Sequence, residues 1–298
     1  MNDIALYQAL LAQLTAELKT LPDKPEETAD STLRALWHTA HGAPKSAELA
    51  SVTELPVLSE FGEAALRALM KKRVTGVPLS HLTERQRFMG LEMLAGPAAL
   101  IPRKETELLA RNAIEVALQM VKERGEIVVV DVCTGSGNVA LALAHYVPGA
   151  RIYAADISGA AVELARRNAS HLGLEGEVEF FVGDLLAPFD SEKFHGAVDL
   201  LACNPPYIKS ATVQQMSSEI FGHEPSLAFD GGAFGVAIML RFVHEAPRFL
   251  RKNGFLLSEV GKGQAPMLAK LLEKNDAFRE VRAISDEANV ERVVLARC

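Results

Sequence analysis

The sequence has few of the features that indicate a secreted or membrane protein. Its 298 residues include three cysteines, Cys133, Cys203 and Cys298, which are too few for a disulfide framework and match no metal-ligand spacing. No apolar run approaches the roughly 20 residues that a membrane helix needs, and the amphipathic start lacks the pattern of a signal peptide. We therefore expect a protein of the reducing cytoplasm, with no membrane partner and no metal.

A surplus of positive charge is also missing. The formal net charge is −7, and aromatic residues make up 6% of the chain. Proteins that hold nucleic acid through its phosphates are basic over the binding face, and single-strand binders add exposed aromatic rings. The composition therefore disfavours direct binding of nucleic acid. Hydrophobic residues at 49% and charged residues at 23% are typical of a globular protein with a sizeable core.

The first third of the chain has the pattern of helices followed by a hairpin. Apolar residues recur at helical spacing through residues 1–82, and Ser31 and Ser59 are expected to cap two of the helices. Residues 83–103 then change character and predict a β-hairpin linker of two short strands around a turn at Gly96–Pro97. We expect residues 1–82 to form a small helical domain and residues 104–298 to form the main domain.

From residue 104 onward, helical patterns alternate with short apolar strands. Runs such as "EIVVVD" and "VDLLAC" are continuously apolar, as expected for strands buried on both faces. Strands separated by helices predict an α/β fold with a mostly parallel sheet. The last two strands, near residues 278–284 and 290–296, are close enough in sequence to pair antiparallel.

A glycine-rich turn follows the first strand of this sheet, in "VVVDVCTGSGNVALALA". Gly135 and Gly137 allow the backbone to approach a ligand, and the next helix begins with unpaired amides. Asp156 ends the next strand about 20 residues later, where a carboxylate can bind ribose hydroxyls, and Asp184 follows the third strand. The loop has no phosphate-binding lysine, so a nucleoside ligand without phosphates, such as S-adenosylmethionine, fits better than a nucleotide. An ordinary tight strand-to-helix turn is the structural alternative.

The segment "NPPY", residues 204–207, directly follows the apolar strand "VDLLAC". Two prolines fix the backbone and lack N–H groups, so carbonyl oxygens there can face a ligand with little local competition. An amide nitrogen at this turn could donate its hydrogens to the Asn204 side-chain oxygen and to a carbonyl near Pro205. Tyr207 adds a flat ring. A Pro-Pro strand terminator is the alternative without a function.

These motifs together resemble the HemK/PrmC family, protein-(glutamine-N5) methyltransferases that use S-adenosylmethionine. The resemblance covers roughly residues 65–297. It rests on "LIPRKETELL", "DVCTGSGNVALALA", "AADIS", "GDLL", "NPPYI", "HEPSLAFDGG" and "LLSEVGKGQ". It implies a helical substrate-recognition domain followed by a Rossmann-like methyltransferase domain, whose seven-stranded sheet is mostly parallel with an antiparallel last strand.

The resemblance also implies roles for individual residues. Asn204, Pro205, Pro206 and Tyr207 would form the catalytic site and hold the glutamine amide. The implied cofactor-binding residues are Asp131, Cys133, Thr134, Gly135, Ser136, Gly137, Asp156, Ile157, Asp184, Leu185 and Asn204. Cys133 departs from the family, which usually has glycine at that position.

Three glutamates within these motifs are further candidates. Glu105 would help to close the cofactor pocket. Glu224 and Pro225 would form either a flap over the site or an ordinary surface loop. Glu259, at the end of a strand, would either face the site or have a structural role at the sheet edge.

Four functions follow as alternatives. The first is methylation of a glutamine side chain in a protein, most directly the Gly-Gly-Gln loop of a peptide chain release factor. The second keeps the fold and cofactor but methylates a nitrogen or oxygen of a small molecule. The third is adenine-N6 methylation of nucleic acid, because "NPPY" also occurs in those enzymes. The fourth is a cofactor-binding scaffold without turnover.

Overall fold

The computed structural model describes residues 3–21, 23–213 and 222–298, and these form two compact units. One unit falls within Met1–Pro97, Ile101–Lys104 and Ser217–Glu224, and the other within Ala98–Leu100, Glu105–Met216 and Pro225–Cys298. We call them the helical unit and the sheet unit. The domain boundaries expected after residues 82 and 103 stay a prediction.

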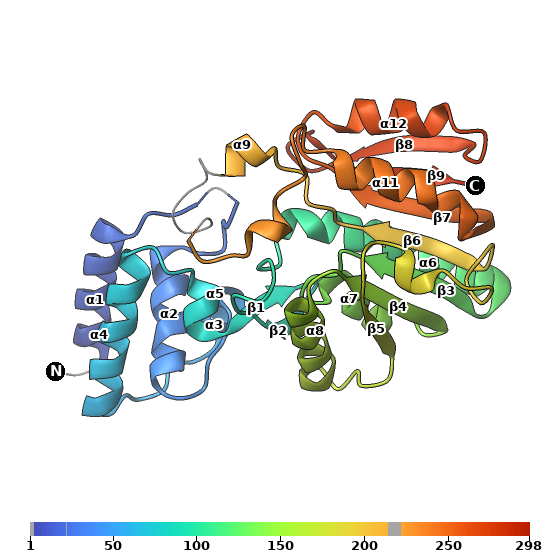
Figure 1. The fold of residues 1–298 in the computed structure, drawn as a ribbon. Coiled ribbons are helices and arrows are strands. Elements are labelled where there is room, and N and C mark those ends of the chain that lie inside the picture. The colour runs from blue at the N-terminus through green and yellow to red at the C-terminus, as the bar shows by residue number, and fades with distance from the viewer. Residues whose placement is uncertain (1–2, 22, 214–221) are drawn as a thin grey trace. The chain divides into compact units, whose positions relative to one another are not determined.

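The helical unit surrounds its own apolar core (Figure 1). Its elements are α1 (Asp3–Glu17), α2 (Ala29–Ala40), α3 (Ala47–Val52), α4 (Glu60–Val74), α5 (Leu79–Thr83), β1 (Arg85–Phe88) and β2 (Leu91–Leu94). The single tryptophan, Trp37 on α2, is 1% exposed and lies in this core, together with Leu10 and Leu66.

Two local predictions in this unit were wrong. The hairpin turns at Met89–Gly90, where both residues have positive φ, and not at Gly96–Pro97. A two-residue turn of this kind needs positive φ at both positions, and Met89 gives no such signal in the sequence. Helix α2 begins before Ser31, because Thr28 caps it and the Ser31 hydroxyl accepts a hydrogen bond from the Thr28 N–H in return. The expected cap at Ser59 is confirmed.

The sheet unit contains a seven-stranded sheet in the order β5-β4-β3-β6-β7-β9-β8. Its elements are α6 (Glu107–Arg124), β3 (Ile127–Val132), α7 (Asn138–Tyr146), β4 (Ala150–Asp156), α8 (Gly159–His171), β5 (Val178–Val182), β6 (Val198–Cys203), α9 (Ser210–Val213), α11 (Ala237–Glu245), β7 (Leu250–Glu259), α12 (Ala265–Glu273), β8 (Glu280–Ser285) and β9 (Glu291–Arg297). Strands β3 to β7 pair in parallel, and β9 pairs antiparallel with both neighbours. The expected α/β fold, with seven strands and an antiparallel last strand, is confirmed.

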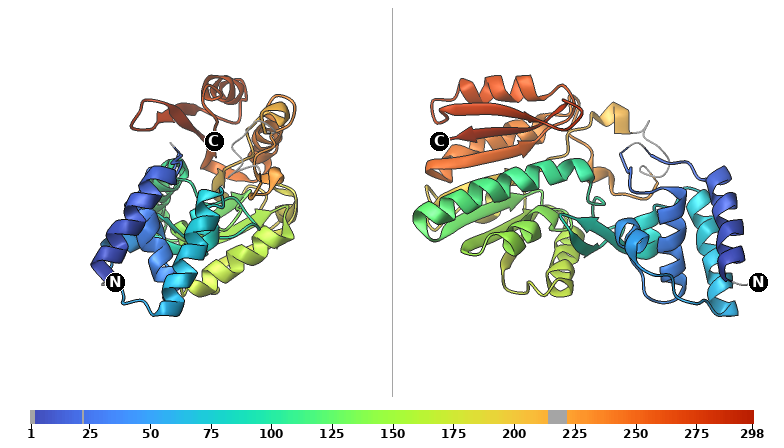
Figure 2. Two further views of the ribbon diagram at one scale, coloured as in Figure 1. Left: turned by 90° about the vertical axis from the view of Figure 1, so that its left-hand side faces the viewer. Right: turned by 180° about the vertical axis from the view of Figure 1, so that it is seen from behind.

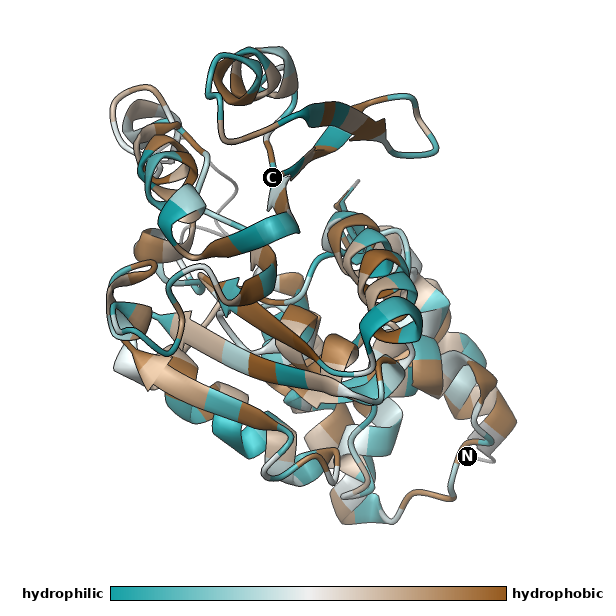
Figure 3. Cartoon of the chain, turned by 90° about the vertical axis from the view of Figure 1, so that its right-hand side faces the viewer, coloured by the Kyte–Doolittle hydropathy of each residue, from teal (hydrophilic) through white to brown (hydrophobic). Residues whose placement is uncertain are grey.

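Helices cover both faces of this sheet (Figure 2). Helices α11 and α12 contribute Met239, Phe242 and Leu268 to a core cluster that also contains Val130 and Leu201 from the central strands. Helix α6 lies on the opposite face and packs against α7. Long hydrophobic stretches therefore run along the central strands (Figure 3), as expected for strands without a solvent-exposed face.

The order of the strands determines where a ligand can bind. The chain proceeds outward from β3 to β5 and then returns to place β6 on the other side of β3. In open parallel sheets, ligands bind at the carboxyl ends of the strands beside such a reversal. The glycine-rich loop follows β3 and "NPPY" follows β6. Because Val132 pairs with Cys203, the first residues of the two loops are next to each other.

Candidate active site

The glycine-rich loop, residues 133–137, connects β3 to α7 through a series of left-handed residues. Cys133, Gly135 and Gly137 have φ values of 57°, 55° and 82°. A Cβ on Gly137 would lie 3.0 Å from the Ala165 Cβ, so glycine lets this loop pack against α8. A Cβ on Gly135 would meet nothing within 4 Å, so this part of the loop faces open space. Cys133 adopts the left-handed backbone conformation that glycine adopts most readily, and glycine is the usual residue at this position in the HemK/PrmC family.

Two aspartates hold this loop in place through hydrogen bonds. The Thr134 hydroxyl donates to Asp131 Oδ2 at 2.6 Å, and burial raises the pKa of Asp131 to about 7. Asp156 Oδ2 accepts the Gly135 N–H and its Oδ1 accepts the Ser158 N–H, both at 2.9 Å. Burial also raises the pKa of Asp156, against the opposing effect of these backbone donors. Asp131 is 1% exposed and therefore shapes the loop without facing solvent.

The residues next to these carboxylates differ in exposure. Ile157 directly follows β4 and is 54% exposed, so a solvent-exposed apolar residue is next to Asp156 in the chain. Asp184 pairs with Arg241 on α11 at 2.9 Å, and both side chains are partly exposed. Leu185 has a φ of 48° and is buried in the core, while Ser136 is buried within the loop.

The "NPPY" turn is held by groups from three other parts of the sheet unit. Asn204 Nδ2 donates to Thr106 Oγ1 at 3.2 Å. The Tyr207 hydroxyl lies 3.2 Å from both Glu105 Oε1 and Glu259 Oε1. The tyrosine carbonyl oxygen accepts a hydrogen bond from Gln264 Nε2 at 3.0 Å. These contacts fix the Asn204 amide and the tyrosine ring at the end of β6.

The segment "DGGAFG", residues 230–235, packs closely against the backbone of the same turn. A Cβ on Gly231 would lie 2.6 Å from the Pro206 carbonyl oxygen, and one on Gly235 would lie 2.5 Å from the Tyr207 carbonyl oxygen. Both distances are shorter than real Cβ contacts, so only glycine allows this approach. Ile208 and Asp230 also form an isolated parallel bridge. Contacts with this segment therefore help to fix the backbone conformation of the "NPPY" turn.

Charged groups gather around the Tyr207 hydroxyl. Burial raises the pKa of Glu259 to about 8, and Glu105 adds to that effect, while Thr106, Tyr207 and Arg292 oppose it. Burial likewise holds the pKa of Tyr207 well above its ordinary value, so the phenol keeps its proton. Arg292 lies 3.6 Å from Glu105 and 3.2 Å from Asp286. A neutral Glu259 thus lies beside a charged Glu105–Arg292 pair.

The raised pKa of Glu259 predicts a pH dependence of stability. The folded protein keeps a proton that the unfolded chain has released above its ordinary pKa of 4.5. Below pH 4.5 the Glu259 carboxyl is protonated in both the folded and the unfolded protein, and the free energy of unfolding is highest with respect to this group. It decreases as the pH rises towards about 8, by at most about 1.4 kcal/mol per pH unit. Urea unfolding at pH 5.5, 6.5 and 7.5, followed by circular dichroism, should show a steeper decline for wild type than for Glu259→Gln. Parallel pH profiles would contradict a neutral Glu259.

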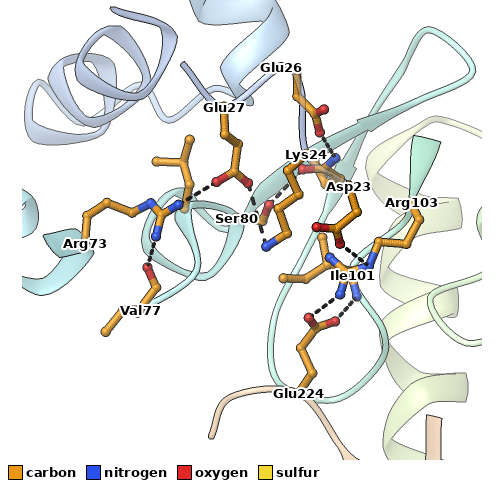
Figure 4. A network of polar contacts seen from close by, with 12 residues as sticks. Asp23, Lys24, Glu26, Glu27, Arg73, Val77, Ser80, Ile101, Arg103 and Glu224 are labelled. Carbon is orange, nitrogen blue, oxygen red and sulfur yellow. Dashed lines mark hydrogen bonds and ion pairs between the residues drawn. The ribbon is translucent and has the colours of Figure 1, made fainter. Parts of the chain in front are cut away.

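Glu224 is buried, unlike a residue of an ordinary surface loop. It is 5% exposed, accepts the Ile101 N–H at 2.9 Å and binds Arg103 at 2.6 Å, all within the helical unit. Arg103 also lies 4.0 Å from Asp23. Figure 4 shows this cluster beside a second buried pair, Arg73 with Glu27 at 2.9 Å. An ordinary surface loop was therefore the wrong expectation for Glu224, and a flap stays a prediction.

Sequence reasoning missed several residues that contact the candidate site. Thr106 lies in the quoted motif "LIPRKETELL" but was not singled out, and Gln264 ends the motif "LLSEVGKGQ". Arg292 gives no local signal, because its partner Glu105 is far away in the sequence. Among the described residues, no group of three or more histidine, cysteine, aspartate or glutamate side chains is arranged to hold a metal ion. Within the same residues, no helix is long and apolar enough to cross a membrane.

Comparison with known proteins supports this interpretation of the fold. Residues 111–237 match the family model of the methyltransferase small domain. Among solved structures, the hMettl16 catalytic domain in complex with the MAT2A 3′UTR hairpin 6 has the same fold. Its TM-score is 0.53 with 14% identity, over 76% of this chain and 81% of that one. The matched family model and the curated relatives together show an S-adenosylmethionine-dependent methyltransferase.

Curated relatives identify the family. The release factor glutamine methyltransferase of Moorella thermoacetica is 38% identical over 76% of each chain. That of Bradyrhizobium diazoefficiens is 33% identical over 91% of this chain and 89% of the relative, and that of Gloeobacter violaceus is 34% identical over 80% and 82%. The chain belongs to the release factor glutamine methyltransferase family.

Proposed function

We propose that this protein transfers a methyl group from S-adenosylmethionine to a glutamine side-chain nitrogen in a peptide chain release factor. The observation that carries the proposal is the pairing of Val132 with Cys203. It brings the glycine-rich loop beside Asn204 at one edge of the sheet, and this supports a cofactor site next to a turn that would bind the acceptor amide. The names of the curated relatives support the release factor as acceptor. The activity would then belong to the cytoplasm, where release factors act.

The residues around the loop suit S-adenosylmethionine. Asp156 lies where a carboxylate can accept hydrogen bonds from ribose hydroxyls, and its two oxygens keep lone pairs beyond those used by the backbone. The exposed Ile157 side chain offers an apolar surface to an adenine ring, and we assign Asp184 and Leu185 to the same part of the cofactor site. Bound S-adenosylmethionine supplies a methyl group on a positively charged sulfur. The proposed cofactor residues are Asp131, Cys133, Thr134, Gly135, Ser136, Gly137, Asp156, Ile157, Asp184, Leu185 and Asn204.

The "NPPY" residues would orient the acceptor. Asn204 Oδ1 and the Pro205 carbonyl oxygen accept the two N–H groups of the glutamine amide, which fixes the nitrogen for attack on the methyl group. These acceptors also favour the positive charge that develops on that nitrogen as the methyl carbon separates from sulfur, and one of the two N–H protons is then lost to solvent. Pro206 keeps the turn rigid, and the Tyr207 ring packs against the flat amide.

The test uses purified protein, S-adenosylmethionine with a labelled methyl group, and release factor from cells that lack this methylation. We expect label on the glutamine of the Gly-Gly-Gln loop and none on a release factor in which that glutamine is replaced by alanine. Glutamine amides without a protein and adenine-containing oligonucleotides serve as competing acceptors. Label on either of these but not on the release factor would overturn the proposed acceptor. Failure to bind the cofactor would overturn its proposed binding site.

A further inference from the structure

The Tyr207 hydroxyl has a single proton but two carboxyl neighbours. Glu105 Oε1 and Glu259 Oε1 each lie 3.2 Å from its oxygen. One O–H group can donate to only one of them at a time, so the second contact needs a proton on the carboxyl group. In one of the two contacts Tyr207 is therefore the donor and in the other it is the acceptor, and the surrounding charges determine which carboxyl group carries the proton.

The charges favour Glu105 as the ionised member. It lies 3.6 Å from the Arg292 guanidinium, and its side chain is partly exposed, whereas Glu259 is 2% exposed. An ionised carboxylate costs much less beside an arginine than alone in the interior. Glu259 then keeps its proton and donates to the Tyr207 oxygen, while Tyr207 donates to Glu105.

Thr106 continues the chain of hydrogen bonds to Asn204. Its side chain is buried, and its hydroxyl lowers the pKa of the Glu259 carboxyl, as a hydrogen-bond donor does. Among the described residues, Glu259 Oε2 is buried and has no hydrogen-bond partner. A buried acceptor without a donor is costly, which favours a Thr106 hydroxyl whose proton is directed at Oε2. In that arrangement Thr106 Oγ1 accepts from Asn204 Nδ2, 3.2 Å away.

We propose that Thr106 and Glu259 are positioning residues that fix the Asn204 side-chain amide with Oδ1 turned towards the methyl acceptor. This inference rests on the proposed role of Asn204 in binding the acceptor amide. In the reversed orientation, Asn204 Oδ1 would face the lone pairs of Thr106 Oγ1, so two acceptors would meet without a proton between them. The Asn204 NH2 group would then face the N–H groups of the methyl acceptor, so two donors would meet there. When Asn204 Nδ2 faces Thr106, each contact along Asn204–Thr106–Glu259–Tyr207–Glu105 has one donor and one acceptor. With the amide reversed, the contact between Asn204 and Thr106 has two acceptors and no donor.

Kinetics of three variants test the proposal. Thr106→Val keeps the shape of the side chain but removes the acceptor, and we expect kcat to fall about tenfold or more with unchanged affinity for S-adenosylmethionine. Thr106→Ser should restore kcat to within about threefold of wild type, since it restores the hydroxyl. Glu259→Gln should also stay within about threefold, because its carbonyl accepts from Thr106 and its NH2 donates to Tyr207.

A matched control separates this effect from a general loss of stability. Thr32→Val makes the same substitution in the core of the helical unit, where the Thr32 hydroxyl is fully buried and has no hydrogen-bond partner among the described residues. We expect it to leave kcat unchanged. Wild-type turnover in Thr106→Val, or a loss in Glu259→Gln as large as in Thr106→Val, would overturn the proposal.

A second measurement needs no acceptor and so remains valid if the proposed function fails. In NMR spectra of protein labelled with 15N on asparagine, Asn204→Ala identifies the side-chain NH2 signals of Asn204. Hydrogen exchange of the Nδ2 proton bound to Thr106 should be about tenfold faster in Thr106→Val than in wild type and Thr32→Val. Equal exchange rates in the three proteins would overturn the orientation by Thr106, whichever acceptor is methylated.

Discussion

Asn204→Ala is expected to lower kcat for methyl transfer by about 10²- to 10³-fold, the loss typical of removing one preorganised group that stabilises a developing charge. The side-chain oxygen that would hold the acceptor nitrogen is lost, while the backbone carbonyl of Pro205 stays in place. The cofactor loop keeps its support from Asp131 and Asp156. The dissociation constant for S-adenosylmethionine should therefore change by less than about tenfold, because Asn204 is one of the eleven residues proposed to bind it and the loss of a single hydrogen bond costs about 1 kcal/mol.

This prediction is checked by single-turnover kinetics and by calorimetric titration with S-adenosylmethionine. Asn112→Ala is the matched control, since Asn112 lies on α6 and, within the described residues, its side chain bonds only to the Leu108 carbonyl oxygen. It should keep the wild-type kcat. Turnover of Asn204→Ala within about threefold of wild type would contradict the role of Asn204 in the transition state. A parallel loss of cofactor affinity and turnover would assign Asn204 to cofactor binding instead.

Removing one partner of the buried Arg103–Glu224 pair should destabilise the helical unit by about 3 kcal/mol or more. The two side chains are 2.6 Å apart and nearly inaccessible, so Arg103→Leu leaves the Glu224 carboxylate buried without its cation. Among the described residues, the carboxylate would keep the Ile101 N–H, at 2.9 Å, as its remaining hydrogen-bond partner. Glu224→Leu removes the shortest ion pair of Arg103 but leaves Asp23 4.0 Å from the guanidinium, so we expect a loss at the lower end of this range.

Tryptophan fluorescence measures this effect selectively, because the only tryptophan, Trp37, is buried in the helical unit. Urea unfolding followed at Trp37 should shift to lower midpoints in both single variants. The double variant should be less destabilised than the sum of the two, since it leaves no unpaired charge. Glu63→Gln, in the exposed pair with Arg67, should cost no more than about 0.5 kcal/mol. Additive losses in the double variant would show that the two charges are not coupled.

The sequence predicts the order of elements and the position of both loops because these depend on local patterns. Continuous apolar runs distinguish the strands of a covered sheet from helices with one apolar face. Glycines and prolines mark strand ends, so the loop at residues 133–137 and the "NPPY" turn can be located from sequence alone. A parallel sheet then places both loops at the same edge, as the structure shows.

Details that depend on competition between nearby residues were predicted less well. Thr28 and Ser31 can both cap a helix, and the choice depended on the reciprocal bond between them. The hairpin turn at Met89–Gly90 lacks the usual Asn-Gly or Asp-Gly signal, whereas Gly96–Pro97 resembles a turn but follows the second strand.

The sequence by itself thus determined the α/β fold, its mostly parallel sheet and the two loops that carry the proposed site. Only the tertiary structure decided which polar side chains meet. Asn204 reaches Thr106 and Tyr207 reaches Glu105 across about a hundred residues, and Glu224 binds Arg103 across a similar separation. Periodicity specifies which face of an element is buried, but the partner of a buried polar group depends on how distant elements pack.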